Sequence, residues 1–277
     1  MLHLARLARI FVAAFPFAFA TLAPAQSPKD TAPAALTPQP STPMAIPYTP
    51  AKRQDGRHVV ALDIGHTAVQ HGSTSARGEG EFAFNQRIVR LLAARLEKSM
   101  VVAPYVINPE GGKIALFDRA NVAAQQGAEL FLSIHHDSAN DKYLRTWEPN
   151  GDGKKQQYSD QFRGYGVFVS RKNRQADRSL QFALSLGSAM KSRGFVFAPH
   201  HHEPISGENR PILDEARGVY QYDDLIVLKN APMPAALLEC GVIINRDEEL
   251  ELKRPETQAR IADAAATAIE SYFKSGL

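Results

Sequence analysis

Residues 235–242, Ala-Ala-Leu-Leu-Glu-Cys-Gly-Val, are apolar except for Glu239. A run of this length and composition is typical of a β-strand that is buried on both faces, so we expect helices above and below the sheet that contains it. Burying a carboxylate costs free energy unless the group is paired, and such groups are often found at functional sites. Glu239 is therefore a candidate functional residue. Its neighbour Cys240 should point to the opposite face of the strand, into the core.

Short apolar runs and amphipathic stretches alternate along the rest of the chain from His58 onward. Short apolar runs predict strands at 58–63, 101–107, 129–135 and 166–170, and amphipathic stretches predict helices at 81–98, 116–126, 175–192 and 259–273. This alternation predicts an α/β fold in a single domain, with a mostly parallel twisted sheet flanked by helices on both faces. In such sheets, ligands bind beyond the C-terminal ends of the strands.

The first 57 residues differ in composition from the rest. Two arginines precede an apolar stretch that is too short to span a bilayer and that ends in Ala23-Pro24-Ala25. Residues 1–25 are therefore predicted to be a secretory signal peptide rather than a membrane anchor. Residues 26–57 contain seven prolines and few large apolar side chains, which predicts an extended linker. The folded domain would then comprise residues 58–277 of a protein that is exported to the periplasm, or secreted, with no membrane span in its mature form.

Charge and cysteine content exclude several classes of protein. The chain has 32 Lys and Arg against 29 Asp and Glu, and without Arg6 and Arg9 of the signal peptide the balance is 30 against 29, or +1. A nearly neutral chain lacks the excess of positive charge with which proteins bind nucleic acid. The single cysteine, Cys240, excludes a disulfide within the chain and a zinc site built from several thiolates. A lone thiol fits an oxidising compartment, and we expect a monomer.

Polar clusters occur where the predicted strands end or just after them. They are Asp63-Ile64-Gly65-His66, Ser133-Ile134-His135-His136-Asp137, Glu239, and the pair Glu79 and Glu81 at the start of the first helix. Because parallel strands end at one edge of a sheet, these clusters should converge on one rim. Two imidazoles and one carboxylate with an open fourth position form a catalytic zinc site, and a further glutamate can take a proton from the attacking water. These residues predict a zinc hydrolase.

The same residues resemble the motifs of the zinc-dependent N-acetylmuramoyl-L-alanine amidases, the cell-wall amidases of the amidase 3 family. The first motif matches Asp63-Ile64-Gly65-His66, with Glu81 fifteen residues after His66 and Asn85 where the family has an asparagine. The second is similar to Arg119 to Ala124 followed by Ser133-Ile134-His135, and the third to Pro234 to Asn245. The resemblance spans about residues 58–273, essentially the whole folded unit.

This resemblance implies a fold like that of the zinc exopeptidases and amidases. It implies that His66, Glu81 and His135 bind one zinc ion and that Glu239 is the catalytic carboxylate. It also implies the substrate, the amide between N-acetylmuramic acid and the L-alanine of the peptidoglycan stem peptide, and a role in remodelling or degrading the cell wall. No protein activator is identified by the residues. The first loop departs from the family's usual sequence, without changing the ligand types, at Ile64, Thr67, Ala68 and Gln70.

Two of these assignments have a neighbouring alternative. His136 follows His135, and adjacent residues on a strand face opposite ways, so we expect His135 to be the ligand and His136 to contact substrate or to support the site. Glu79 is the alternative to Glu81, and position in the motif favours Glu81. Arg119 matches the second motif and could equally form a structural ion pair.

Two stretches have the composition of insertions around this core. Residues 140–164 are rich in Gly, Asp, Lys and Gln, which predicts a loop over the site. Residues 198–222 contain His200-His201-His202, which we expect in an exposed loop rather than at a metal. Some relatives carry an inhibitory helix in this region. Pro204 and Pro211 argue against a long helix here and favour a loop that faces the substrate.

Two other functions are compatible with the same residues. A secreted zinc peptidase acting on ordinary peptides would use the same ligands and the same chemistry, so only its substrate preference would distinguish it. A non-catalytic wall-binding module would be free to lose Glu239 or one of the three ligands. The presence of all four residues argues against such a module.

Overall fold

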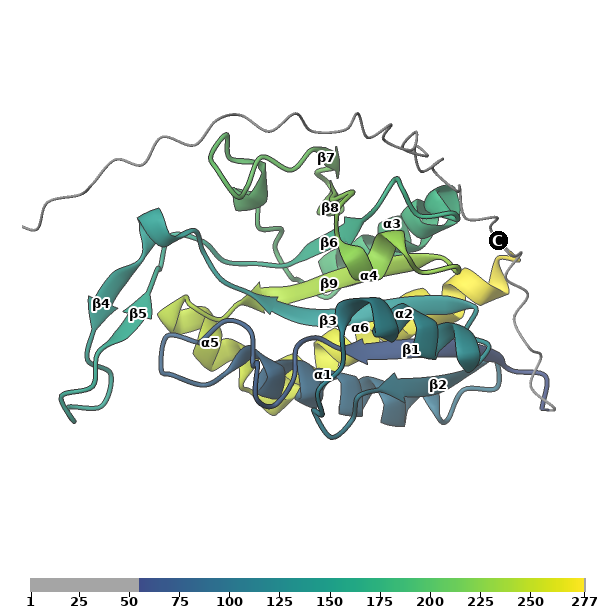
Figure 1. The fold of residues 1–277 in the computed structure, drawn as a ribbon, viewed down its shortest axis with the longest axis horizontal. Coiled ribbons are helices and arrows are strands. Elements are labelled where there is room, and N and C mark those ends of the chain that lie inside the picture. Colours follow the sequence, from purple (N-terminus) through teal and green to yellow (C-terminus); the bar gives the residue numbers. More distant parts are fainter. Residues whose placement is uncertain (1–54, 277) are drawn as a thin grey trace, which may run out of the picture. The chain divides into compact units, whose positions relative to one another are not determined.

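The computed structural model describes residues 55–276, so the predicted signal peptide and the predicted linker up to residue 54 lie outside the described residues. A seven-stranded sheet forms the centre of this part of the chain (Figure 1). In spatial order its strands are β2 (Val102–Ile107), β1 (His58–Ile64), β3 (Leu130–Asp137), β9 (Ala235–Val242), β6 (Gly166–Val169), β8 (Val219–Gln221) and β7 (Ile212–Asp214). Within the described residues, no helix is long and apolar enough to cross a membrane.

Four neighbouring strands of this sheet run in the same direction. β1 pairs in parallel with β2 and β3, and β3 pairs in parallel with β9, so their arrows all point to the left in Figure 1. β6 runs antiparallel to β9, and β8 lies parallel to β6. β7 forms the edge of the sheet and pairs antiparallel with β8. The prediction of a mostly parallel sheet is confirmed. The C-terminal ends of the four parallel strands form one edge, at which the polar clusters meet.

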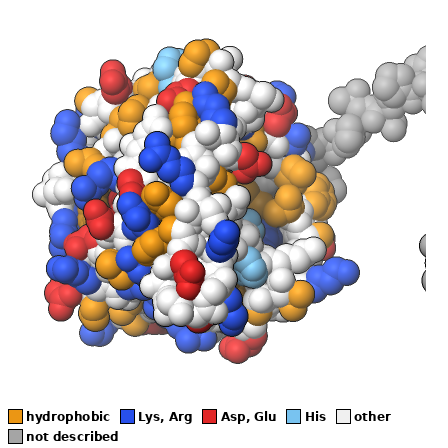
Figure 2. All heavy atoms as spheres, turned by 90° about the vertical axis from the view of Figure 1, so that its left-hand side faces the viewer, with side chains coloured by type: hydrophobic (Ala, Val, Ile, Leu, Met, Phe, Trp, Pro, Cys, Tyr) orange, Lys and Arg blue, Asp and Glu red, His pale blue; other side chains and the backbone are white. Residues whose placement is uncertain are grey.

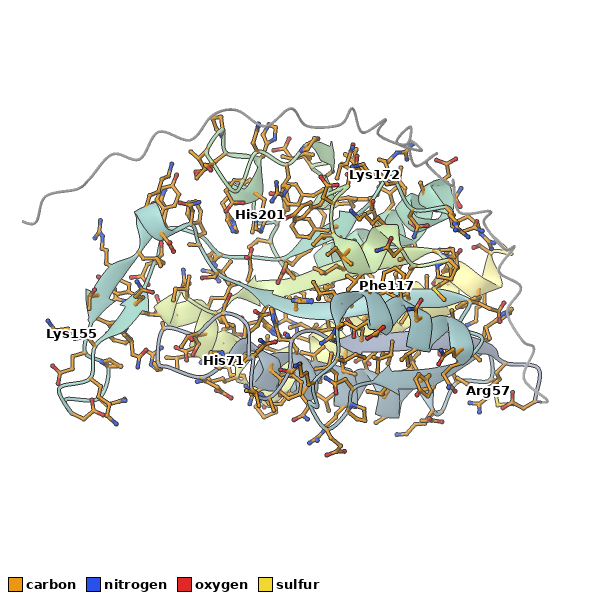
Figure 3. All side chains as sticks on the ribbon, in the orientation of Figure 1. Arg57, His71, Phe117, Lys155, Lys172 and His201 are labelled. Carbon is orange, nitrogen blue, oxygen red and sulfur yellow. The ribbon has the colours of Figure 1, made fainter. Side chains whose placement is uncertain are left out.

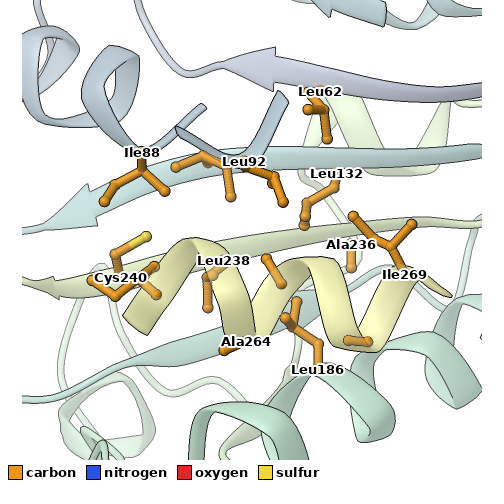
Figure 4. Packing of buried hydrophobic residues seen from close by; sticks show 14 of the residues in the cluster. Leu62, Ile88, Leu92, Leu132, Leu186, Ala236, Leu238, Cys240, Ala264 and Ile269 are labelled. Atoms are coloured by element: carbon orange, nitrogen blue, oxygen red, sulfur yellow. The ribbon is translucent and has the colours of Figure 1, made fainter. Parts of the chain in front are cut away.

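Helices cover both faces of the sheet because the inner strands are apolar on both sides. On one face α1 (Glu81–Leu96), α3 (Ala176–Ser192) and α6 (Pro255–Lys274) pack on a core that includes Leu62, Leu132 and Leu238 (Figure 4). On the other face α2 (Leu116–Gln125) and α4 (Ile226–Lys229) lie over a second cluster with Phe131 and Leu237. Cys240 is buried in the first cluster, as expected.

The two predicted insertions contain more structure than expected. Within residues 140–164 there is a 3-10 turn, η1 (Asp141–Tyr143), and a two-stranded hairpin of β4 (Arg145–Trp147) and β5 (Gln156–Tyr158). Residues 198–222 contain a second 3-10 turn, η2 (His200–His202), followed by β7 and β8. The expectation of simple loops was wrong, because strands of three residues are too short to show a period of two. No long helix occurs in residues 198–222, in agreement with the two prolines.

Two further differences concern helices at the C-terminal end. A short helix, α5 (Arg246–Leu252), follows β9 and was not predicted. Its N-cap is Asn245, whose side chain accepts hydrogen bonds from the backbone N–H groups of Asp247 and Glu248. α6 begins at Pro255 rather than at residue 259, because proline is favoured in the first turn, where its missing N–H has no helical partner to lose.

Candidate active site

His66, Glu81 and His135 come from three separate elements and meet at the C-terminal edge of the sheet. His66 follows β1 in a left-handed backbone conformation with φ of 67°, Glu81 is the first residue of α1, and His135 lies near the end of β3. Nε2 of His66 is 2.9 Å from Oε2 of Glu81, and Nδ1 of His135 is 3.0 Å from Oε1. The ligand atoms of the three residues all lie within 4.8 Å of one another. One carboxylate and two imidazoles therefore converge on a single point.

Two glycines leave the space that these side chains occupy. A Cβ atom on Gly65 would lie 2.5 Å from Nε2 of His135. A Cβ atom on Gly72 would lie 2.5 Å from Nε2 of His66 and closer still to Oε2 of Glu81. Gly72 also has φ of 77°, which side chains other than glycine rarely adopt. The backbone is thus shaped to hold the three side chains in contact.

Glu81 is held in place by a network of hydrogen bonds below the cluster. Its Oε1 atom accepts bonds from Nδ2 of Asn85, at 3.1 Å, and from the backbone N–H of His136, at 3.2 Å. The N–H of Ser73 donates to Oε2 at 3.0 Å. Burial alone would raise the pKa of Glu81, but hydrogen bonds from His135 and His66 hold this pKa well below its usual range. Glu81 is thus an anion fixed in one orientation.

His136 faces the opposite side of β3 from His135. Its Nδ1 lies 2.8 Å from Oδ1 of Asn85 and its ring lies beside Phe84 of α1. Burial lowers the pKa of His136 to about 3, so its ring is neutral. Since Asn85 in turn donates to Glu81, His136 supports the carboxylate from behind and stands away from the point of convergence.

Glu79 lies away from the two histidines. Its carboxylate is 2.6 Å from Nη1 of Arg87 and 3.0 Å from Nζ of Lys253. Burial would raise the pKa of Glu79, but the hydrogen bonds from Arg87 and Lys253 lower it. The carboxylate that the fold brings to His66 and His135 is that of Glu81.

Asp63 and Arg119 form a buried ion pair beneath the His66 loop. Nη1 of Arg119 is 2.6 Å from Oδ1 of Asp63, and Ser133 Oγ donates to Oδ2 at 2.7 Å. The same guanidinium donates to the backbone carbonyls of Ile64, at 2.7 Å, and His66, at 2.5 Å. Arg119 therefore joins α2 to the end of β1 and orients the backbone that carries His66. This is the structural role that the sequence left open for Arg119.

Glu239 stands beside the cluster, on the neighbouring strand. It is the register partner of His135 in the parallel pair of β3 and β9, so both side chains project from the same face of the sheet. Its Oε2 atom is buried and has no hydrogen-bond partner among the described residues. Burial raises the pKa of Glu239 well above its usual range, and the charges of Asp137 and Glu81 raise it further. A carboxyl group with a raised pKa beside a possible reaction centre is suited to taking up and returning a proton.

Two cavities border these residues and share Leu225 and Leu237. The larger, of about 490 Å³, is lined by His66, His135 and Arg119 and by apolar side chains of α2 and α4. The smaller, of about 160 Å³, contains Glu239. Figure 2 looks onto this end of the molecule, where basic and acidic side chains are interspersed and histidine reaches the surface.

A second group of titratable side chains was not expected from the sequence. Asp137, at the end of β3, contacts His200 and His201 of η2. The prediction that the three consecutive histidines lie in an exposed loop is wrong for His200, which is only 3% exposed. The only hint in the sequence was the run of histidines itself, because Asp137 lies more than 60 residues away along the chain.

Comparison with known proteins identifies the family of the chain. The family described as N-acetylmuramoyl-L-alanine amidase, amidase 3, matches residues 60–271. The N-acetylmuramoyl-L-alanine amidase AmiA of Escherichia coli (strain K12) is 27% identical over 247 residues, which cover 80% of this chain and 78% of that protein.

Solved structures show the same fold. The N-acetylmuramoyl-L-alanine amidase from Clostridium difficile 630 superposes with a TM-score of 0.60 at 23% identity, covering 79% of this chain and 98% of that one. The CwlD amidase from Clostridioides difficile, solved in complex with the GerS lipoprotein, gives a TM-score of 0.59 at 18% identity, covering 79% and 100%.

Proposed function

This chain is an amidase of the N-acetylmuramoyl-L-alanine amidase family, amidase 3, and on that premise we propose that it is a zinc-dependent hydrolase of peptidoglycan. The bond cleaved would be the amide between N-acetylmuramic acid and the L-alanine of the stem peptide, the bond named in the family's description. Cleavage there separates peptide from glycan and would serve to remodel or degrade the cell wall.

His66, Glu81 and His135 are the residues that would hold one zinc ion. The donor set is a combination that zinc favours in catalytic sites, two imidazole nitrogens and a carboxylate oxygen. Their ligand atoms converge within 4.8 Å, and the glycines at 65 and 72 leave room for them. The bonds from Asn85 and Ser73 fix the carboxylate, as supporting residues commonly do at metal sites. The residues present fit the ion.

Glu239 would be the catalytic carboxylate. A zinc ion held by His66, Glu81 and His135 would supply Lewis-acid chemistry, polarising the scissile carbonyl and lowering the pKa of water. Glu239 would accept the proton of the attacking water at its Oε2 atom, which has no other partner among the described residues, and would return it to the leaving nitrogen of L-alanine. The apolar wall of the larger cavity, beside His66 and His135, would exclude water from one side of the bond.

We also propose where in the cell the enzyme acts. The amino-terminal sequence favours export through a signal peptide at residues 1–25, with residues 26–57 as a linker and residues 58–277 as the catalytic domain. We place the protein in the periplasm, or outside the cell, with peptidoglycan as its partner. One relative, CwlD, is solved with a lipoprotein partner, so the assay below is run with and without extract from the host envelope.

The observation that carries the proposal is the convergence of His66, Glu81 and His135 beside Glu239. The test is mass spectrometry of purified peptidoglycan after incubation with the chain, with and without a chelator. Free stem peptides that begin with L-alanine are expected, and the chelator should abolish them. Cuts within the peptide would indicate a peptidase instead. Bound zinc without any cut, even with envelope extract, would contradict the catalytic proposal.

A further inference from the structure

We propose that Asp137, His200 and His201 form a second site for a divalent metal ion such as Zn²⁺, separate from the cluster of His66, Glu81 and His135. Nε2 of His201 is 2.7 Å from Oδ2 of Asp137, and Nε2 of His200 is 3.0 Å from the same oxygen. Ligand atoms of the three residues lie within 4.8 Å of one another. Like the first cluster, this one offers two imidazoles and one carboxylate, a donor set that suits zinc.

Ion pairing alone does not explain why the side chain of His200 is buried. Its side chain is 2% exposed, and neither ring nitrogen makes a hydrogen bond with a described residue. Nε2 contacts Asp137 without the geometry of a hydrogen bond, so the ring is buried with this nitrogen toward Asp137. Burying an imidazole whose ring nitrogens make no hydrogen bond costs free energy. A metal ion between the three side chains would bind one of these nitrogens and offset that cost.

His201 has the support that is typical of a metal-bound histidine. Its Nδ1 is 2.7 Å from Oε2 of Glu208, while Nε2 points to Asp137. A carboxylate that accepts the proton of one ring nitrogen fixes the tautomer and leaves the other nitrogen free to bind a metal. Figure 3 shows His201 above β9, the strand that carries Glu239.

The surroundings provide room to complete the coordination. His201 and Glu208 line the 160 Å³ cavity together with Glu239. That cavity has room for water, which would complete the coordination of an ion held by the three side chains. Without a metal, His201 contacts the carboxylates of Asp137 and Glu208, and the buried ring of His200 is left without a hydrogen bond to the described residues.

The test is the number of zinc ions per chain. Tag-free full-length protein is stripped with chelator and dialysed against buffered zinc, and bound metal is measured by plasma mass spectrometry. Two ions per chain are expected. His201→Ala and Asp137→Asn should each retain one, and Glu208→Gln should keep both sites but weaken one about 10- to 100-fold. His202→Ala, at an exposed residue of the same turn, is the matched control and should retain two.

His66→Asn separates this proposal from the proposed function. It should lose the other ion and retain the one at Asp137, whatever its activity. A single bound ion in the unsubstituted chain would overturn the second site, and so would two bound ions in His201→Ala. Loss of the second ion in His202→Ala would overturn it as well. Because a substitution could impair folding, the unsubstituted protein is also tested by anomalous diffraction at the zinc edge. A peak between Asp137, His200 and His201 is expected, and a peak only at His66 and Glu81 would refute the proposal.

Discussion

His135 and Glu239 are register partners on the adjacent parallel strands β3 and β9, and their side chains lie on the same face of the sheet. This pairing places a carboxyl group with a raised pKa directly beside one of the two imidazoles that contact Glu81. In the proposed mechanism β3 supplies a zinc ligand and the neighbouring strand β9 supplies the proton acceptor, and this arrangement follows from the register. Four predictions test it and the structure that supports it.

Glu239→Gln should abolish turnover while leaving the zinc content at the His66 cluster unchanged. The substitution removes the proton acceptor but keeps the shape of the side chain, so we expect a loss of about 10²- to 10⁴-fold in kcat. The measurement is release of stem peptide, together with metal analysis of the same sample. Glu110→Gln, at an exposed position, is the control. Retained activity in Glu239→Gln would show that another group moves the proton.

Gly72→Ala should weaken zinc binding. The added Cβ would meet Nε2 of His66 and Oε2 of Glu81, so one of these ligands must move, and we expect affinity to fall about 10-fold or more. Gly151→Ala is a matched control, because Gly151 also has a positive φ, of 67°, but nothing lies within 4 Å of its added Cβ. Titration against a chromophoric chelator measures both. Equal affinities in the two variants would contradict the steric argument.

Arg119→Met should destabilise the fold, because it leaves Asp63 charged and buried without its partner. Both side chains are at most 2% exposed, so the expected loss in the free energy of unfolding is about 3–5 kcal/mol. Arg95→Met removes two pairs that are 3.6 Å long and in which the arginine is exposed, and it should cost no more than about 1 kcal/mol. Denaturant unfolding measures each variant. The double variant Asp63→Asn with Arg119→Met should recover part of the loss, and no recovery would show that the charge is not the cause.

Glu248→Gln should change how stability depends on pH. Burial raises the pKa of Glu248 from 4.5 to about 7, although the backbone N–H groups of Val242 and Gly164 donate to it and lower it. Between these two values the unfolded chain releases the proton and the folded chain keeps it, so this carboxyl lowers folding stability as pH rises, and the penalty is complete above about 7. The variant lacks this penalty.

The free energy of unfolding of Glu248→Gln relative to the unsubstituted chain should therefore increase from pH 4.5 to about 7 and then level off, by at most about 3 kcal/mol. Urea unfolding at a series of pH values measures the difference, with Glu97→Gln as a surface control. A flat difference would show that the pKa of Glu248 is the same in the folded and the unfolded chain.

Much of the architecture could be predicted from local sequence pattern. The apolar run at 235–242 predicted a doubly covered strand, and β9 has these bounds. Short apolar runs predicted the inner strands, and the helical period of apolar residues predicted α1, α2 and α3, within a few residues. These elements are visible in sequence because a strand buried on both faces is a continuous apolar run, and a helix buried on one face repeats its apolar residues with its own period. β4, β5, β7 and β8 have three residues each and show no such period.

Local sequence pattern is enough to predict which residues end the parallel strands, and thus that His66, His135 and Glu239 share one edge. It also favours His135 over His136, since neighbours on a strand face opposite ways. The pairing of Glu79 with Arg87, and the contacts of His200 and His201 with Asp137, become visible only in the folded chain. The reason is physical: direction along a strand and alternation across it are local properties of the backbone. The convergence of side chains from distant loops depends on the path that the whole chain takes around the sheet.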